Sequence, residues 1–113
     1  MITIYGIKNC DTMSKTFKWF DDKKIPYQFH NYKTEGLSKT KFNNWLQLAD
    51  LNVLINTKGT TFRSLSDSDK LSILKKATSF EIVSNNTSVL KRPIIEINDQ
   101  LIIGFKPEVW GKF

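Results

Sequence analysis

The chain has 113 residues, 40% of them hydrophobic and 25% charged, and this balance predicts one globular domain over residues 1–113. It has no apolar run near the roughly 20 residues of a membrane span and no signal-peptide pattern, so we expect a cytoplasmic protein without membrane contact. The formal net charge of +6 favours anionic partners. Its lysines are scattered, however, which argues against direct binding of nucleic acid and leaves a small anionic ligand open.

The first third of the chain is predicted to form a strand, a helix and a second strand. Residues 2–5 alternate apolar and polar side chains, as strands do. After a short turn, residues 11–24 have helical spacing with one buried stripe, made by Met13, Phe17 and Phe20. Pro26 is predicted to end this helix, and residues 27–32 are predicted to be the second strand. Such a unit predicts parallel strands joined by a right-handed crossover.

The middle of the chain is predicted to be helical. Apolar side chains recur there at helical spacing, at Phe42, Trp45, Leu46 and Ala49. Residues 66–69, with the sequence SDSD, have the pattern of a helix N-cap before an apolar run. Residues 56–61 are polar and predict a loop between these helices.

The last part of the chain is predicted to be a hairpin and a short helix. Pro93 introduces a strand over residues 94–97, Asn98–Asp99 marks a turn, and residues 101–103 form the returning strand. Pro107 fits the first turn of a closing helix. The complete order predicts an α/β protein with a thioredoxin-like mixed sheet and a helical insertion, although ferredoxin-like folds share parts of this order.

Cys10 is the candidate for chemistry. It lies between the first strand and the first helix, a place where ligands of α/β proteins bind. Unpaired backbone N–H groups at a helix N-terminus favour a thiolate over a thiol, and Lys8 adds a positive charge nearby. A small buried hydrophobic residue without chemistry is the alternative for Cys10. One cysteine and one histidine, His30, are too few ligands for a metal, so we interpret His30 as structural.

Basic residues supply candidates for binding an anion near Cys10. Arg92 precedes Pro93 in a loop that the topology places beside the first helix, and its planar guanidinium suits an oxyanion. Pro93 is a candidate for a cis peptide bond. Lys106 follows the hairpin on the same side, and Lys58 and Arg63, which flank the polar loop, are weaker candidates. The alternative for each of these residues is an ordinary solvent-exposed cation without a ligand.

Three ordered segments together resemble a known family: residues 4–12 (IYGIKNCDT), 56–61 (NTKGTT) and 91–93 (KRP). They resemble the ArsC-like arsenate reductase family, in particular its YffB branch, which is grouped with Spx/MgsR-type regulators. The resemblance covers essentially the whole chain. It implies a thioredoxin-like fold with a helical insertion and a cytoplasmic bacterial protein.

The same resemblance implies roles for individual residues. Cys10 aligns with the nucleophilic cysteine of the family, and Arg92 aligns with the anion-binding arginine before the proline. Two further arginine positions of arsenate reductases hold weaker anion binders here, Lys106 and either Thr57 or Lys58. Gly6 stands where arsenate reductases have a histidine that assists the cysteine.

These observations predict a monothiol oxidoreductase, similar to arsenate reductase and to YffB, that acts as a monomer. Cys10 attacks an oxyanion or a glutathione-type mixed disulfide. Glutathione or another small thiol is the expected co-substrate, because the chain has no second thiol to resolve the intermediate, and no bound cofactor is expected. The alternative is a Spx/MgsR-like regulator that binds the C-terminal domain of the RNA polymerase α subunit without catalysis. Met13 replaces the second cysteine of the Cys-x-x-Cys switch in redox-sensing members.

Overall fold

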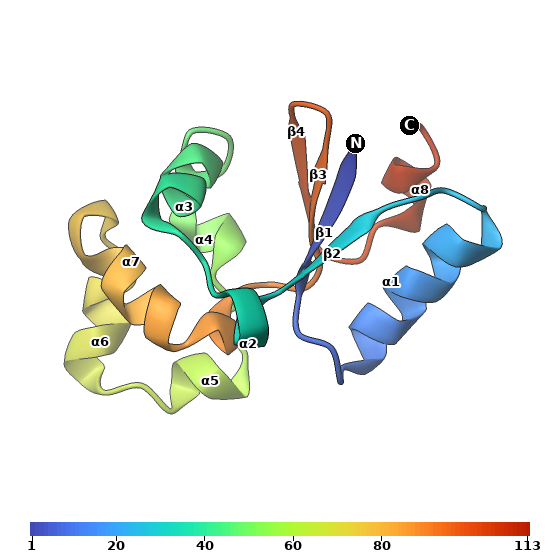
Figure 1. Ribbon diagram of the computed structural model, residues 1–113. Helices are drawn as coiled ribbons and strands as arrows, with labels where there is room; N and C mark the ends of the chain where they lie inside the picture. The colour runs from blue at the N-terminus through green and yellow to red at the C-terminus, as the bar shows by residue number, and fades with distance from the viewer. The chain divides into compact units, whose positions relative to one another are not determined.

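The computed structural model describes all residues, 1–113, and its contacts divide the chain into two compact units. The first unit joins Met1–Glu35 to Arg92–Phe113, and the second is Gly36–Lys91. Figure 1 shows the sheet and its two covering helices in the first unit, and a group of short helices in the second. We describe each unit by itself.

The first unit contains a four-stranded mixed sheet with the strand order β2-β1-β3-β4. Its strands are β1 (Ile2–Gly6), β2 (Gln28–Asn31), β3 (Ile94–Ile97) and β4 (Gln100–Ile103). β1 pairs with β2 in parallel and with β3 antiparallel, and β3 pairs with β4 antiparallel. The predicted strand–helix–strand unit and hairpin are therefore confirmed.

One face of this sheet carries the core of the first unit. Ile4, Ile95 and Ile102 are paired neighbours across three strands and are buried. They pack with Met13 and Phe20 of α1 (Asp11–Asp22) and with residues of α8 (Pro107–Trp110). Figure 1 shows α1 and α8 on the same side of the sheet. Burial of this apolar surface is the main force that holds both helices there.

The end of α1 differs from the prediction that Pro26 stops it. The helix ends at Asp22, because Lys24 adopts a left-handed backbone with a φ of 58°. The Lys24 N–H then donates to the Asp21 carbonyl at 3.0 Å, and the Ile25 N–H donates to the Phe20 carbonyl at 3.0 Å. This pair of bonds is a Schellman motif, which satisfies the carbonyls that the helix leaves free.

The second strand is also shorter than predicted, since β2 ends at Asn31 and α2 (Tyr32–Glu35) begins directly after it. The Asn31 side chain explains the change. Its Oδ1 accepts a hydrogen bond from the Lys33 backbone N–H at 3.0 Å, and the Asn31 backbone N–H donates to Glu35 Oε2 at 3.1 Å. Local bonds of this kind turn the chain out of the strand.

The second unit is helical, as predicted for the middle of the chain. It contains α3 (Lys39–Leu46), α4 (Leu51–Leu54), α5 (Thr60–Arg63), α6 (Asp67–Ser72), α7 (Lys76–Asn85) and the 3-10 helix η1 (Thr87–Val89). Phe42 and Trp45 are buried, and Ser66 caps α6 by accepting from the Asp69 N–H at 3.1 Å. The polar loop is shorter than expected, since α5 begins at Thr60. None of the helices combines the length and the hydrophobicity of a membrane-spanning segment.

Candidate functional site

Cys10 is the N-cap residue of α1. Its carbonyl accepts the Ser14 N–H at 2.9 Å, while its thiol makes no capping hydrogen bond. The side chain is half-buried and packs against the core cluster of the first unit. Cys10 therefore stands at the N-terminus of a twelve-residue helix, the end at which backbone N–H groups have no intrahelical partners.

The strand register brings three predicted cations to the end of the sheet where β1 leads into Cys10. Tyr5, near the end of β1, pairs with Ile94, which begins β3, and Ile94 pairs with Ile103, which ends β4. The residues just outside these three positions therefore share one end of the sheet. They are Lys8 after β1, Arg92 before β3 and Lys106 after β4.

These cations differ in burial. Arg92 is half-buried, whereas Lys8 and Lys106 are exposed. The peptide bond between Arg92 and Pro93 is cis, and the Pro93 carbonyl accepts the Gly104 N–H at 2.8 Å. That bond ties the loop before β3 to the loop that carries Lys106. Lys58 is exposed and belongs to the second unit, so its role near Cys10 stays a prediction.

The Met13 side chain occupies the space that a side chain at position 6 would need. A Cβ atom on Gly6 would lie 2.6 Å from both the Sδ and the Cε of Met13, far inside the contact distance. Both atoms belong to the flexible end of the fully buried Met13 side chain, so a Cβ at position 6 would force Met13 into another rotamer within the core. Met13 thus fills the place that a side chain at position 6 would take, which explains why glycine fits there.

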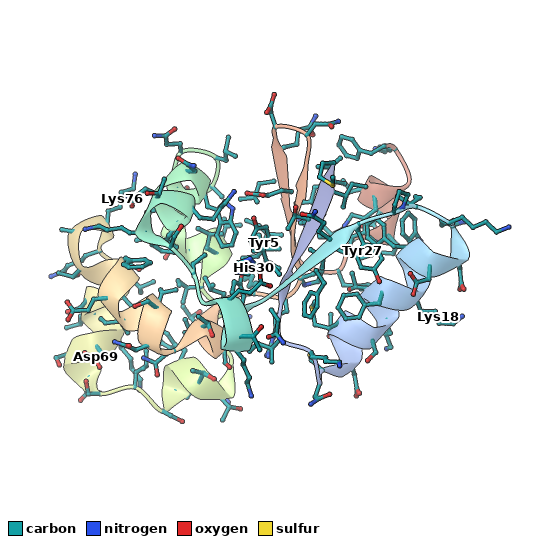
Figure 2. The ribbon with its side chains drawn as sticks, viewed as in Figure 1. Tyr5, Lys18, Tyr27, His30, Asp69 and Lys76 are labelled. Carbon is teal, nitrogen blue, oxygen red and sulfur yellow. The ribbon has the colours of Figure 1, made fainter.

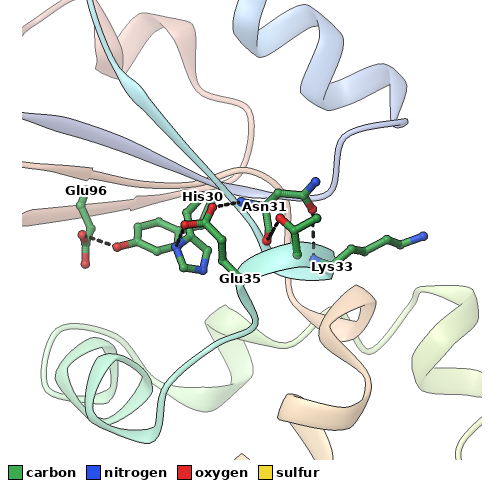
Figure 3. Close-up of polar contacts among 7 residues, drawn as sticks. His30, Asn31, Lys33, Glu35 and Glu96 are labelled. Atoms are coloured by element: carbon green, nitrogen blue, oxygen red, sulfur yellow. Dashed lines mark hydrogen bonds and ion pairs between the residues drawn. The ribbon is translucent and has the colours of Figure 1, made fainter.

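The opposite face of the sheet carries a polar and aromatic cluster that the sequence interpretation did not identify. The Tyr5 hydroxyl donates to Glu96 at 2.8 Å. Figure 2 places Tyr5 beside His30, and Figure 3 shows His30, Glu35 and Glu96 in close-up. The Tyr5 ring lies 4.8 Å from the His30 ring and 6.3 Å from the Tyr32 ring, measured between centroids. His30 Nδ1 is 3.9 Å from Glu35 Oε1. These contacts fit the structural role predicted for His30.

Burial and hydrogen bonding set the protonation of this cluster. Burial, followed by the hydrogen bond to Glu96, raises the pKa of Tyr5 well above its usual value. Burial raises the pKa of Tyr32 as well, and its hydroxyl has no hydrogen-bond partner. A glutamate within the apolar run of residues 94–97 was the one sequence signal that pointed to this cluster.

Comparison with known proteins identifies the family. The model of the ArsC family matches residues 5–113, and the chain therefore belongs to this family. A solved structure named YFFB protein has a TM-score of 0.92 and 35% identity, covering 99% of this chain and 97% of its own. An ArsC-related protein from Brucella melitensis has a TM-score of 0.76 and 40% identity, covering 99% of this chain and 92% of its own.

A third relative belongs to a different functional class. The global transcriptional regulator Spx of Listeria innocua is 28% identical over 100% of this chain and 86% of its own length. These likenesses confirm the predicted thioredoxin-like fold and the predicted grouping of arsenate reductase, YffB and Spx proteins.

Proposed function

We propose that this protein is a monothiol reductase in which Cys10 is the nucleophile. The observation that carries the proposal is the position of the only thiol of the chain. Cys10 is the N-cap residue of α1, and its thiol is not engaged in a capping hydrogen bond. It follows β1 at the end of the sheet where Lys8, Arg92 and Lys106 also lie. Reactive cysteines occur at helix N-termini and beside cations, and these cations attract an anionic substrate.

The reaction is a thiol–disulfide exchange in two steps. The Cys10 thiolate attacks one sulfur of the substrate disulfide, so that a Cys10 mixed disulfide forms and the other sulfur leaves as a thiolate that takes up a proton. The thiolate of a small external thiol, such as glutathione, then attacks the mixed disulfide and releases Cys10. For a mixed disulfide of glutathione and a thiol RSH, the thiol RSH is released, and the glutathione half of the substrate and one external glutathione end as one glutathione disulfide. No resident cofactor is needed, and the dependence on a free thiol suits a reducing cytoplasm.

The cations have separate roles in this proposal. Arg92 holds the anionic part of the substrate through two parallel hydrogen bonds from its guanidinium, and its partial burial strengthens them. Lys106 and Lys8 add positive charge from exposed positions, where an ammonium loses more hydration on binding. Lys58 is proposed as an additional anion-binding residue.

Comparing variants with a control tests the proposal. We expect glutathione-dependent turnover of a mixed disulfide by the wild type and none by Cys10→Ser. Arg92→Ala should weaken substrate binding by about 1.5–3 kcal/mol, the free energy of a charge-assisted hydrogen bond. Lys39→Ala, which removes an exposed cation of α3 in the second unit, should leave turnover unchanged. Equal turnover by wild type and Cys10→Ser would sink the proposal.

A regulator is the second candidate, and the Spx relatives favour it. In that case the protein binds the C-terminal domain of the RNA polymerase α subunit through a surface, and no covalent step is involved. Binding of that domain would then be equal for wild type and Cys10→Ser. Such binding, together with no reductase activity on several oxidised substrates, selects the regulator over the reductase.

A further inference from the structure

The two edges of the sheet in the first unit differ in how much backbone they leave unpaired. The outer strands are β2 and β4. At the β2 edge, the Asn31 N–H donates to Glu35 at 3.1 Å, and the Asn31 carbonyl accepts the Thr34 hydroxyl at 3.3 Å. The chain then turns directly into α2. The β2 edge is therefore closed in part by its own chain, and it offers little to a further strand.

The edge of β4 is open. The Gly104 N–H donates to the Pro93 carbonyl at 2.8 Å, and this bond fixes which residues of the antiparallel ladder point toward β3. The backbone N–H and C=O groups of Leu101 and Ile103 point the other way, and no other part of the chain bonds to them. The four-residue strand also contains no proline and no charged side chain, which are common devices that keep a second strand away.

The two ends of this edge carry opposite charges. Asp99 directly precedes β4, and Lys106 follows it after a short loop. Both side chains are exposed, and neither makes an ion pair within the chain. When two copies of such an edge pair antiparallel, the acidic end of each copy meets the basic end of the other, and opposite charges on neighbouring strands attract. The edge is therefore complementary to itself.

The backbone of the edge allows the same pairing. If Leu101 of one copy lies opposite Ile103 of the other, Ile102 lies on the two-fold axis, and every free N–H and C=O group of Leu101 and Ile103 gains a partner. Ile102 and Ile103 are buried within their own chain, and Leu101 is half-buried. Backbone hydrogen bonds and the charges at the two ends, rather than an apolar patch, would hold the two copies together.

We infer that the open edge of β4 pairs antiparallel with β4 of a second copy of this chain, which gives a two-fold symmetric dimer with one continuous sheet. The formal net charge of +6 on each copy opposes this association at low salt. At physiological salt the Debye length is about 8 Å, so the repulsion between distant charges is screened. The inference departs from the monomer expected from the sequence, and it does not depend on the proposed chemistry of Cys10.

Sedimentation velocity over a series of protein concentrations, in about 0.15 M salt, tests the pairing. We expect the mean mass of the wild type to rise with concentration toward that of a dimer. Leu101→Pro removes one free N–H from the open edge but no bond to β3, because that N–H points away from β3. It should raise the dissociation constant of the dimer about tenfold or more. Leu101→Ala keeps the N–H, and as the matched control it should raise the constant much less.

An exchange of charges tests the antiparallel orientation. Asp99→Lys should raise the dissociation constant about two- to tenfold, because it places a lysine near Lys106 of the other copy. The double variant Asp99→Lys/Lys106→Asp restores opposite charges and should return the constant toward the wild-type value. Glu81→Lys makes the same change in net charge at an exposed position of α7 in the second unit, and it should have little effect.

Each other outcome counts against the pairing. A wild type that stays monomeric up to about 1 mM overturns the inference. A dimer that Leu101→Pro and Leu101→Ala weaken equally overturns it as well, because the open backbone would then not be the contact. If Leu101→Pro does not fold, the exchange of charges decides: recovery in the double variant supports the pairing, and no recovery overturns it. None of these outcomes changes the proposed function of Cys10.

Discussion

At the scale of single residues, the close packing of Met13 against Gly6 predicts how a substitution at position 6 changes stability. Gly6→Ala should destabilise the protein by about 1–3 kcal/mol, because the new Cβ meets the fully buried Met13 thioether. In a Met13→Ala background the space is empty, and the same substitution should be neutral or stabilising, since alanine loses less backbone entropy than glycine. Urea unfolding of the four proteins in this cycle measures the coupling. Equal effects in both backgrounds would show that the two side chains do not compete.

The raised pKa of Tyr5 predicts how the stability of the protein depends on pH. Its pKa in the folded protein is above the unfolded value of about 10, because burial and the bond to Glu96 favour the neutral phenol. Tyr5 therefore contributes its full stability below pH of about 10, and this contribution is lost as pH rises toward the folded pKa. Tyr5→Phe should cost about 1.5–3 kcal/mol near pH 8, and the difference from the wild type should shrink near pH 10.5.

Urea unfolding of both proteins at the two pH values is the test. Tyr27, whose pKa is also raised, is present in both proteins and cancels in the comparison. The pKa of Tyr32 is raised by burial and, to a smaller extent, by Tyr5, so both proteins are compared in a Tyr32→Phe background. A difference in unfolding free energy that is the same at both pH values would contradict the role given to the Tyr5 hydroxyl.

Helix α1 offers a prediction at the scale of the element. Lys24 ends the helix with a φ of 58°, a conformation that glycine adopts without steric cost. Lys24→Gly should therefore stabilise the protein by about 0.5–1 kcal/mol. Lys24→Ala is the control, because it removes the same exposed side chain but keeps a Cβ. Thermal unfolding should show the gain for glycine alone, and a gain for both variants would assign it to the lysine side chain instead.

The same helix shows why some elements were predictable from the sequence and others were not. The buried stripe of α1, the Ser66 cap and the hairpin at Asn98 depend on residues a few positions apart, so local patterns reveal them. The Schellman end at Lys24 uses a residue with no preference for that conformation, and Pro26 gave a misleading signal. Short elements such as α2 depend on one side-chain bond at Asn31, which periodicity does not detect.

At the scale of the whole molecule, the site could be predicted only where topology follows from element order. A strand–helix–strand unit followed by a hairpin brings Cys10, Arg92 and Lys106 to one end of the sheet. The Tyr5–Glu96 bond joins residues 91 positions apart, and the Gly6–Met13 contact depends on the rotamer of one buried side chain. Glu96 within an apolar strand marks a buried polar contact but not its partner, and the Gly6–Met13 contact leaves no pattern in the sequence, because both arise from tertiary packing.

The central claim is that the fold makes Cys10 a reactive nucleophile, and the rate of its reaction with glutathione disulfide tests this most directly. Intact-protein mass spectrometry follows the addition of one glutathione to the single thiol, for the native chain and for the chain unfolded in urea at the same pH. We predict faster addition to the native chain, slower addition to native Arg92→Ala, and complete release of the adduct by excess glutathione. If glutathione adds to the unfolded chain as fast as to the native chain, or faster, the fold does not activate Cys10. Cys10 would then be a partly covered structural cysteine, and the central claim would be wrong.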